Sequence, residues 1–328
     1  PNDFSDQLSR ATAFIIDFYN KVYPEISTSH KPLIGKTKTD LEVAEKIIEK
    51  RINLKPPSQH NFWIGFFSTT LIFLDIYFFG QWIHTATDKV VTEFFREEKE
   101  ELRLSVIKVI VAAAHANHII EVEERKLFEY ILHSADLSSK RNKEAWNLLE
   151  NGILVEEISL PENNSWLLRK YFLELAILTV SADRVVDEKE KEFLLNFTKH
   201  LEFFEEDLED SILALEGFII ENWNEMGELQ NRKSIDQLNE EYENRLGQLL
   251  SKHSKKIISE LSENEAAVRL IQKHRDGNIS PEDNQRLQDM LINIVKILPA
   301  FSSLSLPKSL LTTENLLKIF PEINIGNS

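Results

Sequence analysis

Cysteine is absent from this 328-residue chain, and glycine and proline are scarce, with 9 and 10 residues. The lack of cysteine excludes disulfides, thiolate metal sites and cysteine nucleophiles, and it fits a reducing, cytoplasmic location. Few glycines and prolines leave few breaks in the chain, which favours long helices over a β fold with many turns. Because no convincing alternating strand pattern occurs either, the sequence predicts an all-α helical bundle.

Basic residues are outnumbered, with 38 Lys and Arg against 54 Asp and Glu, and the net charge is -16. A nucleic-acid-binding protein needs a concentrated basic face, so we expect no nucleic-acid partner. Familiar catalytic motifs are also missing: the chain has no glycine-rich phosphate loop, no G-x-S-x-G and no H-E-x-x-H. We therefore expect a protein that is not an enzyme.

A short pattern occurs twice in the chain, at residues 116–124 (ANHIIEVEE) and 182–190 (ADRVVDEKE). A weaker third copy lies at 275–283 (RDGNISPED). The first two copies begin 66 residues apart (182 − 116), which is about the length of three helices with their turns. The pattern predicts an internal duplication, in which 101–150 and 164–222 form superposable helical hairpins around their acidic turns.

The composition along the chain predicts three parts. Residues 1–60 read as N-terminal helices followed by a linker, and 61–222 as a helical domain that contains the duplication. Residues 223–328 read as a long helix followed by a further helical region. The apolar positions of 235–261 repeat every three or four residues, with a polar gap around His253, which predicts a long helix with a narrow seam for one partner helix.

The second acidic turn has two interpretations. Asp187 and Glu190 form a capping box, in which an Asp side chain accepts a backbone N–H and Glu190 reaches back to the cap. Together with Asp183, they also place three carboxylates around one tight turn. Carboxylate oxygens are ligands for calcium, magnesium or manganese, so Asp183, Asp187 and Glu190 are the candidate metal ligands.

The other two copies offer weaker ligand sets. The first has Asn117, Glu121 and Glu124, and His115 and His118 lie three residues apart, a spacing that can turn two imidazoles towards one metal. In the third copy, residues 276–280 are similar to the middle of an EF-hand loop, but the earlier ligand positions do not match.

The most apolar segment of the chain, 62–83, is long enough to cross a bilayer, and Trp63 and Trp82 lie near its ends. Asp75 lies well inside it, where a membrane would impose a large penalty on a charge without a partner. A buried central helix of a bundle is equally apolar. The sequence leaves open a membrane span, a peripheral membrane contact and a core helix with Asp75 beside a polar partner.

Two family resemblances follow from these motifs. The copies at 116–124 and 182–190 share the pattern A-[ND]-x-x-[IV]-[ED]-x-x-E, and the region 85–222 resembles the tellurite-resistance TerB-like family. Members of that family are α-helical domains with acidic turns. The resemblance implies metal binding at these turns and a link to membrane-associated stress complexes.

Region 265–322 resembles the ribosome-binding-like domain of the LETM family, mitochondrial inner-membrane proteins involved in cation/proton exchange. The likeness rests on the order of five short segments: 279–283 (ISPED), 287–291 (LQDML), 294–300 (IVKILPA), 306–307 (LP) and 317–321 (LKIFP). A chain that joins both features is similar to bacterial LETM-related, biofilm-associated proteins.

The sequence therefore predicts a helical scaffold or interaction protein with a protein partner. It would lie in the cytoplasm or at the inner face of the membrane and relate to biofilm formation or envelope stress. The alternative is a cation-handling membrane protein related to the LETM exchangers, with 62–83 in the membrane. A metallohydrolase that uses the second acidic turn is a more distant alternative.

Overall fold

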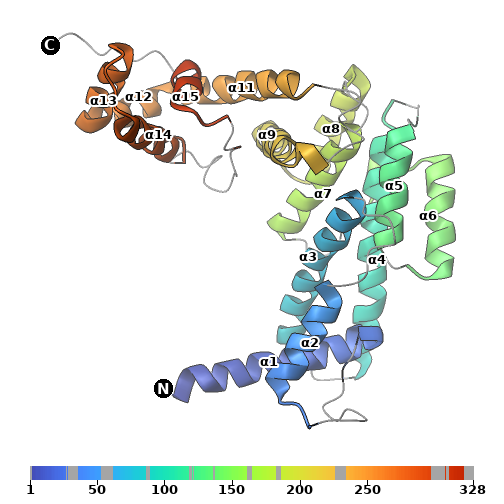
Figure 1. Cartoon of the computed structure of the whole chain (residues 1–328). Helices are drawn as coiled ribbons and strands as arrows, with labels where there is room; N and C mark the ends of the chain where they lie inside the picture. The colour runs from blue at the N-terminus through green and yellow to red at the C-terminus, as the bar shows by residue number, and fades with distance from the viewer. Residues whose placement is uncertain are drawn as a thin grey trace. The chain divides into compact units, whose positions relative to one another are not determined.

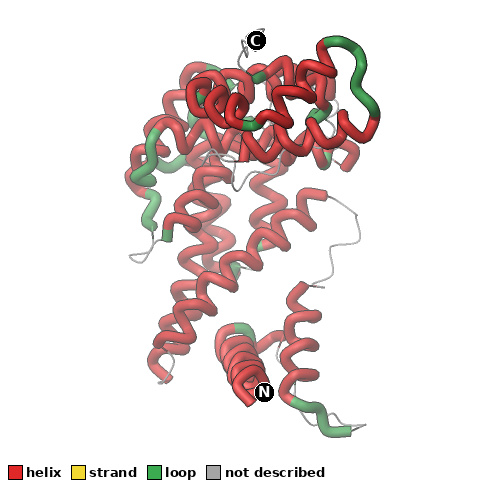
Figure 2. Tube along the Cα trace, turned by 90° about the vertical axis from the view of Figure 1, so that its left-hand side faces the viewer, coloured by secondary structure: helices red, strands yellow, loops and turns green. Residues whose placement is uncertain are grey.

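The computed structural model describes residues 2–26, 28, 36–52, 62–85, 89–117, 120, 122–135, 137–160, 165–181, 186–225, 234–296, 307 and 310–320. Helices account for almost all of these residues, and no strand occurs among them (Figures 1 and 2). The predicted all-α class is confirmed. Contacts divide the chain into two compact units, Pro1–Ser165 and Trp166–Ser328, and each is described below by itself.

Unit 1 contains the helices α1 (Asn2–Val22), η1 (Pro24–Ile26), α2 (Asp40–Ile52), α3 (Phe62–Thr85), α4 (Lys89–Ala114), α5 (Val122–Ser134), α6 (Ser139–Asn151) and η2 (Val155–Glu157). Helix α1 packs against α2, and α3 contacts α1, α4 and α5. The second half of α4 is buried almost without interruption from Leu102 to Ala114, because neighbouring helices cover it on several sides.

The apolar segment 62–83 forms one continuous helix, α3, as the core-helix interpretation predicts. Phe67, Leu74, Phe78 and Trp82 are each at most 2% exposed, which places them in the core of unit 1. Within the part of the chain that the structure describes, no helix has the length and apolar character needed to cross a membrane.

Unit 2 contains the helices α7 (Trp166–Val180), α8 (Glu188–His200), α9 (Glu205–Glu221), η3 (Trp223–Glu225), α11 (Ile235–Lys252), α12 (Ser254–Glu263), α13 (Glu265–Arg275), α14 (Pro281–Lys296) and α15 (Thr313–Ile319). Helices α7, α8 and α9 contact one another. In the C-terminal part, α11 contacts α9 and α15, and α14 contacts α12, α13 and α15.

The predicted long helix over 235–261 is wrong in one respect, because it is two helices. Helix α11 ends at Lys252 and α12 begins at Ser254, and the N–H of His253 donates to the carbonyl of Leu250 instead of that of Leu249, which an unbroken α-helix would use. The expected seam is nevertheless buried: Tyr242 and Leu246 on α11 and Leu261 on α12 are at most 2% exposed. The seam of α11 has two partner helices, α9 and α15, where one was expected.

Each motif copy ends in the first turn of a helix. The first connects α4 to α5, and the second connects α7 to α8. In both copies the first helix also contacts the third, α6 in unit 1 and α9 in unit 2. A duplicated three-helix unit would give this shared contact, but α8 also packs against α9 more extensively than α5 does against α6, and the superposition of 101–150 on 164–222 stays a prediction. The boundary between the units falls between the copies, inside the range 61–222 that the sequence predicts as one domain, because each copy packs its helices within its own unit.

Candidate functional site

The second acidic turn is a capping box at the start of α8, as the first interpretation predicts. Asp187 Oδ1 accepts the backbone N–H groups of Lys189 (2.8 Å) and Glu190 (3.0 Å). In return, Glu190 Oε2 accepts the N–H of Asp187 at 2.7 Å. Both carboxylates also lie at the positive end of the helix dipole, which stabilises negative charge. The arrangement is sufficient to explain why Asp187 and Glu190 occur at these positions.

The candidate metal site is described only in part. Asp183 lies outside the described residues, so the structure does not show whether it approaches Asp187 and Glu190. Among the residues that are described, no group of three or more His, Asp or Glu side chains is arranged to hold a metal ion. Binding of calcium, magnesium or manganese by Asp183, Asp187 and Glu190 therefore stays a prediction.

The equivalent glutamates of the two copies are both buried. Glu124 in α5 and Glu190 in α8 are each 1% exposed, although glutamate is rarely buried. Of the other proposed ligands in the first copy, His118 and Glu121 lie outside the described residues. His115 Nε2 lies 2.8 Å from the carbonyl oxygen of Leu149, so this imidazole hydrogen-bonds to the last turn of α6. That contact gives His115 a role in joining α4 to α6.

The third copy is also a helix cap. Gly277 has φ +69°, a left-handed conformation that ends α13 and that glycine adopts without steric cost. Ser280 Oγ accepts the N–H of Asp283 at 3.1 Å at the start of α14. Lys273 Nζ lies 2.8 Å from Asp283 Oδ2 across the turn. The similarity of 276–280 to an EF-hand loop is therefore explained by a turn between two capped helices.

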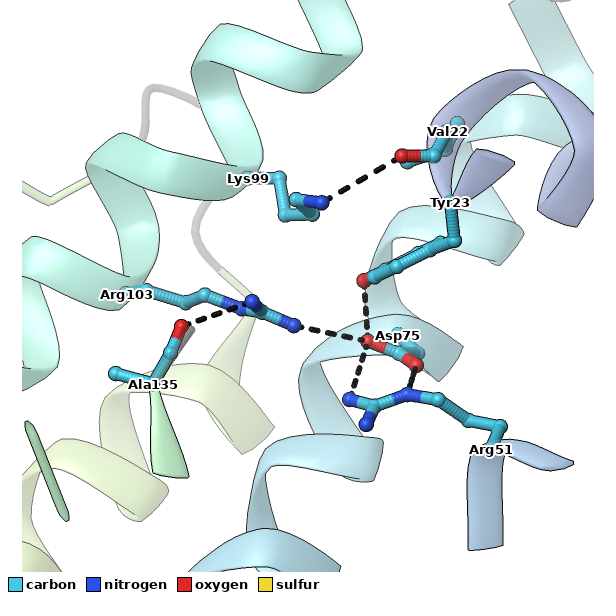
Figure 3. Close-up of polar contacts among 7 residues, drawn as sticks. All are labelled: Val22, Tyr23, Arg51, Asp75, Lys99, Arg103 and Ala135. Atoms are coloured by element: carbon cyan, nitrogen blue, oxygen red, sulfur yellow. Dashed lines mark hydrogen bonds and ion pairs between the residues drawn. The ribbon is translucent and has the colours of Figure 1, made fainter. Parts of the chain in front are cut away.

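A buried polar cluster that the sequence only partly indicates lies inside unit 1 (Figure 3). We call it the Asp75 cluster, and it comprises Tyr23, Arg51, Asp75, Lys99 and Arg103. Arg51 Nε lies 2.5 Å from Asp75 Oδ2, and Arg51 Nη2 lies 3.3 Å from Oδ1. The hydroxyl of Tyr23 donates a hydrogen bond to Asp75 Oδ1, and Arg103 Nη2 approaches the same oxygen at 3.9 Å.

The members of the Asp75 cluster come from three helices and from the residue that follows a fourth. Tyr23 directly follows α1, Arg51 is in the last turn of α2, Asp75 is in α3, and Arg103 is in α4. Arg103 Nη1 also donates to the carbonyl of Ala135 at the end of α5 (2.8 Å), and Lys99 Nζ contacts the carbonyl of Val22 at 3.5 Å. Through one carboxylate and two guanidinium groups, the cluster thus links the five helices from α1 to α5 to one another.

Burial and charge keep the Tyr23 phenol protonated and the Arg51 guanidinium charged near neutral pH, since the pKa of each is raised. Burial raises the pKa of Tyr23 well above its usual value, and the negative charge of Asp75 raises it further. The pKa of Tyr19 is raised by the same two causes. Burial opposes the charge of Arg51, but the hydrogen bond and charge of Asp75 outweigh that effect and raise the pKa of Arg51. A phenol and a guanidinium held in this way donate hydrogen bonds and are poor proton-transfer groups.

Sequence reasoning found Asp75 and its need for a polar partner, and the structure confirms that expectation. It missed Arg51, Arg103 and Tyr23. Arg103 carries the clearest overlooked signal, because it is a single arginine within the apolar run of α4 and is only 2% exposed. Arg51 lies in a polar helix and is buried where it meets Asp75 of α3, and nothing in the local pattern distinguishes it from a surface arginine.

A second feature is an exposed apolar surface at one end of unit 2. Trp166 and Leu167 open α7 and are 53% and 52% exposed, and Phe204 precedes α9 and is 79% exposed. The ring of Trp166 lies edge-on to that of the buried Phe203, with centroids 6.4 Å apart, which brings the start of α7 beside the turn between α8 and α9. We call Trp166, Leu167 and Phe204 the Trp166 patch.

Comparisons of the chain with protein-family models, with curated proteins and with solved structures gave no match. The resemblances to the TerB-like and LETM families therefore rest on the sequence motifs alone.

Proposed function

We propose that this protein is a non-enzymatic helical scaffold that binds a protein partner on the cytoplasmic side of a membrane. The single observation that carries the proposal is the Trp166 patch, where three large apolar side chains are half or more exposed at one end of unit 2. Contiguous exposed apolar side chains on a soluble protein mark interaction sites more often than isolated ones do. Aromatic residues are also enriched in protein interfaces.

The Asp75 cluster supports this proposal from the other unit. Its carboxylate is surrounded by arginines and a tyrosine, all of which lie between packed helices. A buried, hydrogen-bonded ion pair of this kind favours one packing arrangement of the helices. A scaffold needs such a fixed arrangement to present its surfaces. The TerB-like resemblance supports a place near a membrane-associated stress complex, and the resemblance to biofilm-associated proteins supports the same setting.

The test is affinity capture from extract of the source cells with matched variants. The double substitution Leu167→Ser and Phe204→Ser removes apolar area from the patch at two exposed positions. Leu154→Ser is the control, since Leu154 is 67% exposed and lies in unit 1, outside the patch. We expect the parent and the control to retain a common protein that the double variant loses, with unchanged melting temperatures. Identical sets of captured proteins for all three would contradict the proposal.

A further inference from the structure

We propose that the Trp166 patch binds a basic amphipathic helix of the partner protein. This inference rests on the proposed function and adds the chemistry of the partner. Amphipathic helices dock by placing apolar side chains at positions i, i+3, i+4 and i+7 on an apolar surface, while their polar face contacts the rim.

A buried side chain, Phe203, supports the apolar part of the site. Phe203 is 7% exposed, and the Trp166 ring rests against it. The guanidinium of Arg169 lies 5.3 Å from the centre of the Phe203 ring on the same end of the unit. Phe204 is the next residue, and its backbone N–H is fixed by Asp207 Oδ2 at 2.9 Å. Trp166 and Phe204 therefore project from rigid positions, which lowers the entropy lost when a partner binds.

The rim of the patch is acidic. Glu202 has a side chain that is 81% exposed, and Glu205 and Glu206 are exposed in the first turn of α9, directly after Phe204. Three cations lie nearby: Lys199 is exposed in the last turn of α8, and Arg169 and Lys170 are in the first half of α7. Arg169 pairs with Glu202 at 2.7 Å, and Lys170 Nζ donates to the carbonyl of Asp207 at 3.1 Å. Four acids lie at this end of the unit, Glu202, Glu205, Glu206 and Asp207, against the three cations Arg169, Lys170 and Lys199, so the net charge beside the apolar residues is negative. It complements lysine and arginine on a partner.

This negative charge favours a basic helix over two other partners that an apolar surface could bind, namely an anionic membrane and a second copy of the chain. An anionic membrane would bring its phosphates against Glu205 and Glu206, which repel them. A second copy of the chain would bring the same acidic rim against itself if the two patches met face to face. A basic helix gains from both parts of the surface, since apolar side chains cover Trp166 and Phe204 while lysines approach the rim.

The test uses fluorescence anisotropy of the full chain with a labelled model peptide of about 16 residues, with leucine on one helical face and lysine on the other. Two matched peptides replace every lysine with glutamate or every leucine with serine. We expect the Leu/Lys peptide to bind, the two matched peptides to bind at least about tenfold more weakly, and added salt to weaken binding. Absence of binding by the Leu/Lys peptide, or equal binding of the glutamate peptide, would overturn the proposal.

Variants of the chain locate the binding. Phe204→Ser and the double reversal Glu205→Lys and Glu206→Lys should each weaken Leu/Lys peptide binding at least about tenfold. The control reversal is Asp236→Lys with Glu240→Lys, two exposed acids on α11. The pairs Lys252–Glu209 and Arg245–Glu216 show that α11 runs antiparallel to α9, which directs Asp236 and Glu240 to the opposite end of α9. Equal losses in the control and in the patch variants would overturn the proposal.

Two further measurements distinguish a partner helix from a membrane and from a second copy of the chain as the ligand of the patch. Binding of phosphatidylglycerol vesicles that Phe204→Ser abolishes would assign the patch to a membrane and overturn the proposal. Self-association in sedimentation that Phe204→Ser abolishes would assign it to a second copy and overturn it likewise. If affinity capture loses a protein on patch substitution while the Leu/Lys peptide fails to bind, the basic-helix inference falls and the scaffold function stands. If capture is also unchanged, both fall.

Discussion

Arg51 Nε and Asp75 Oδ2 lie 2.5 Å apart, although the two residues are 24 positions apart in the chain and belong to different helices. Both are buried, at 7% and 1% exposure. The contact fixes the last turn of α2 against the middle of α3, and Tyr23 and Arg103 extend it to α1 and α4. The four predictions that follow concern this cluster, the second acidic turn and the buried tyrosines.

The substitution Asp75→Asn should strongly destabilise unit 1. It removes the negative charge that Arg51 and Arg103 share and leaves two buried guanidinium groups without compensation. Breaking a buried ion pair by removing one partner costs about 3–5 kcal/mol. Urea denaturation followed by circular dichroism measures the change in unfolding free energy. The control is Asp6→Asn on the exposed surface of α1, which should change that free energy by less than about 0.5 kcal/mol. An Asp75→Asn loss as small as the control's would show that the cluster is not an important element of unit 1.

The substitution Tyr23→Phe tests how much the hydroxyl of this residue contributes to stability, separately from its ring. The variant loses the hydrogen bond to Asp75 Oδ1 but keeps the ring over which Lys99 Nζ lies, 4.2 Å from the centroid. A hydrogen bond to a charged group contributes about 1.5–3 kcal/mol, so the unfolding free energy should fall by that amount. In the Asp75→Asn background the same substitution should cost less, because the two residues are coupled. Additive losses in the double variant would contradict the contact.

The second acidic turn provides a test of capping against metal binding. Asp187→Ala should lower stability by about 0.5–2 kcal/mol, because it removes the acceptor for two backbone N–H groups. Glu190→Gln should cost less, since glutamine still accepts in a capping box. If capping is the only role, both results are the same with and without divalent ions.

If the turn also binds a cation, millimolar calcium, magnesium or manganese should raise the melting temperature of the parent by mass action. Asp183→Asn and Glu190→Gln should abolish that rise, because each removes an anionic oxygen ligand. Calorimetric titration of the parent with these ions shows whether the turn binds a cation. No heat of binding at millimolar ion, together with a destabilising Asp187→Ala, would leave the cap as the only role of Asp187 and Glu190.

Alkaline pH should unfold the protein through its buried tyrosines. The pKa values of Tyr19, Tyr23 and Tyr242 are raised in the folded state, chiefly by burial, whereas an exposed tyrosine titrates near pH 10. Below about pH 10 these phenols are protonated in both states and cost nothing. As the pH rises above about 10, the unfolded chain releases protons that the folded chain keeps, so stability falls.

Melting curves from pH 8 to 11 measure this loss, and absorbance at 295 nm reports tyrosine ionisation. We expect ionisation of these tyrosines to coincide with unfolding. Tyr23→Phe and Tyr242→Phe should flatten the decline of melting temperature above about pH 10, because each removes one linked proton. If every tyrosine ionised near pH 10 while the helical signal persisted, the burial of these phenols would be disproved.

Much of the local structure follows from the sequence. Few glycines and prolines and the three- and four-residue apolar spacing predicted the helices, and the acid-rich motifs predicted the starts of α8 and α14. These features depend on neighbours in the chain: an Asp187 side chain reaches an N–H two residues away whatever the rest of the protein does. The sequence did not predict the break at His253, because a small change of backbone there interrupts the helix while the apolar stripe continues across it.

The helical class, the caps and the need of Asp75 for a polar partner can all be predicted from the order of the amino acids. Which groups meet Asp75 depends on the fold, because Arg51 is an ordinary polar-helix residue until the last turn of α2 is brought to Asp75 on α3. Packing also places Trp166 against Phe203, 37 residues further along the chain, since the packing of α7 and α8 returns the chain to the start of α7, and this brings the exposed Phe204 to the same end of unit 2. Periodicity reports what one helix buries, whereas the partner across an interface depends on how separate helices pack.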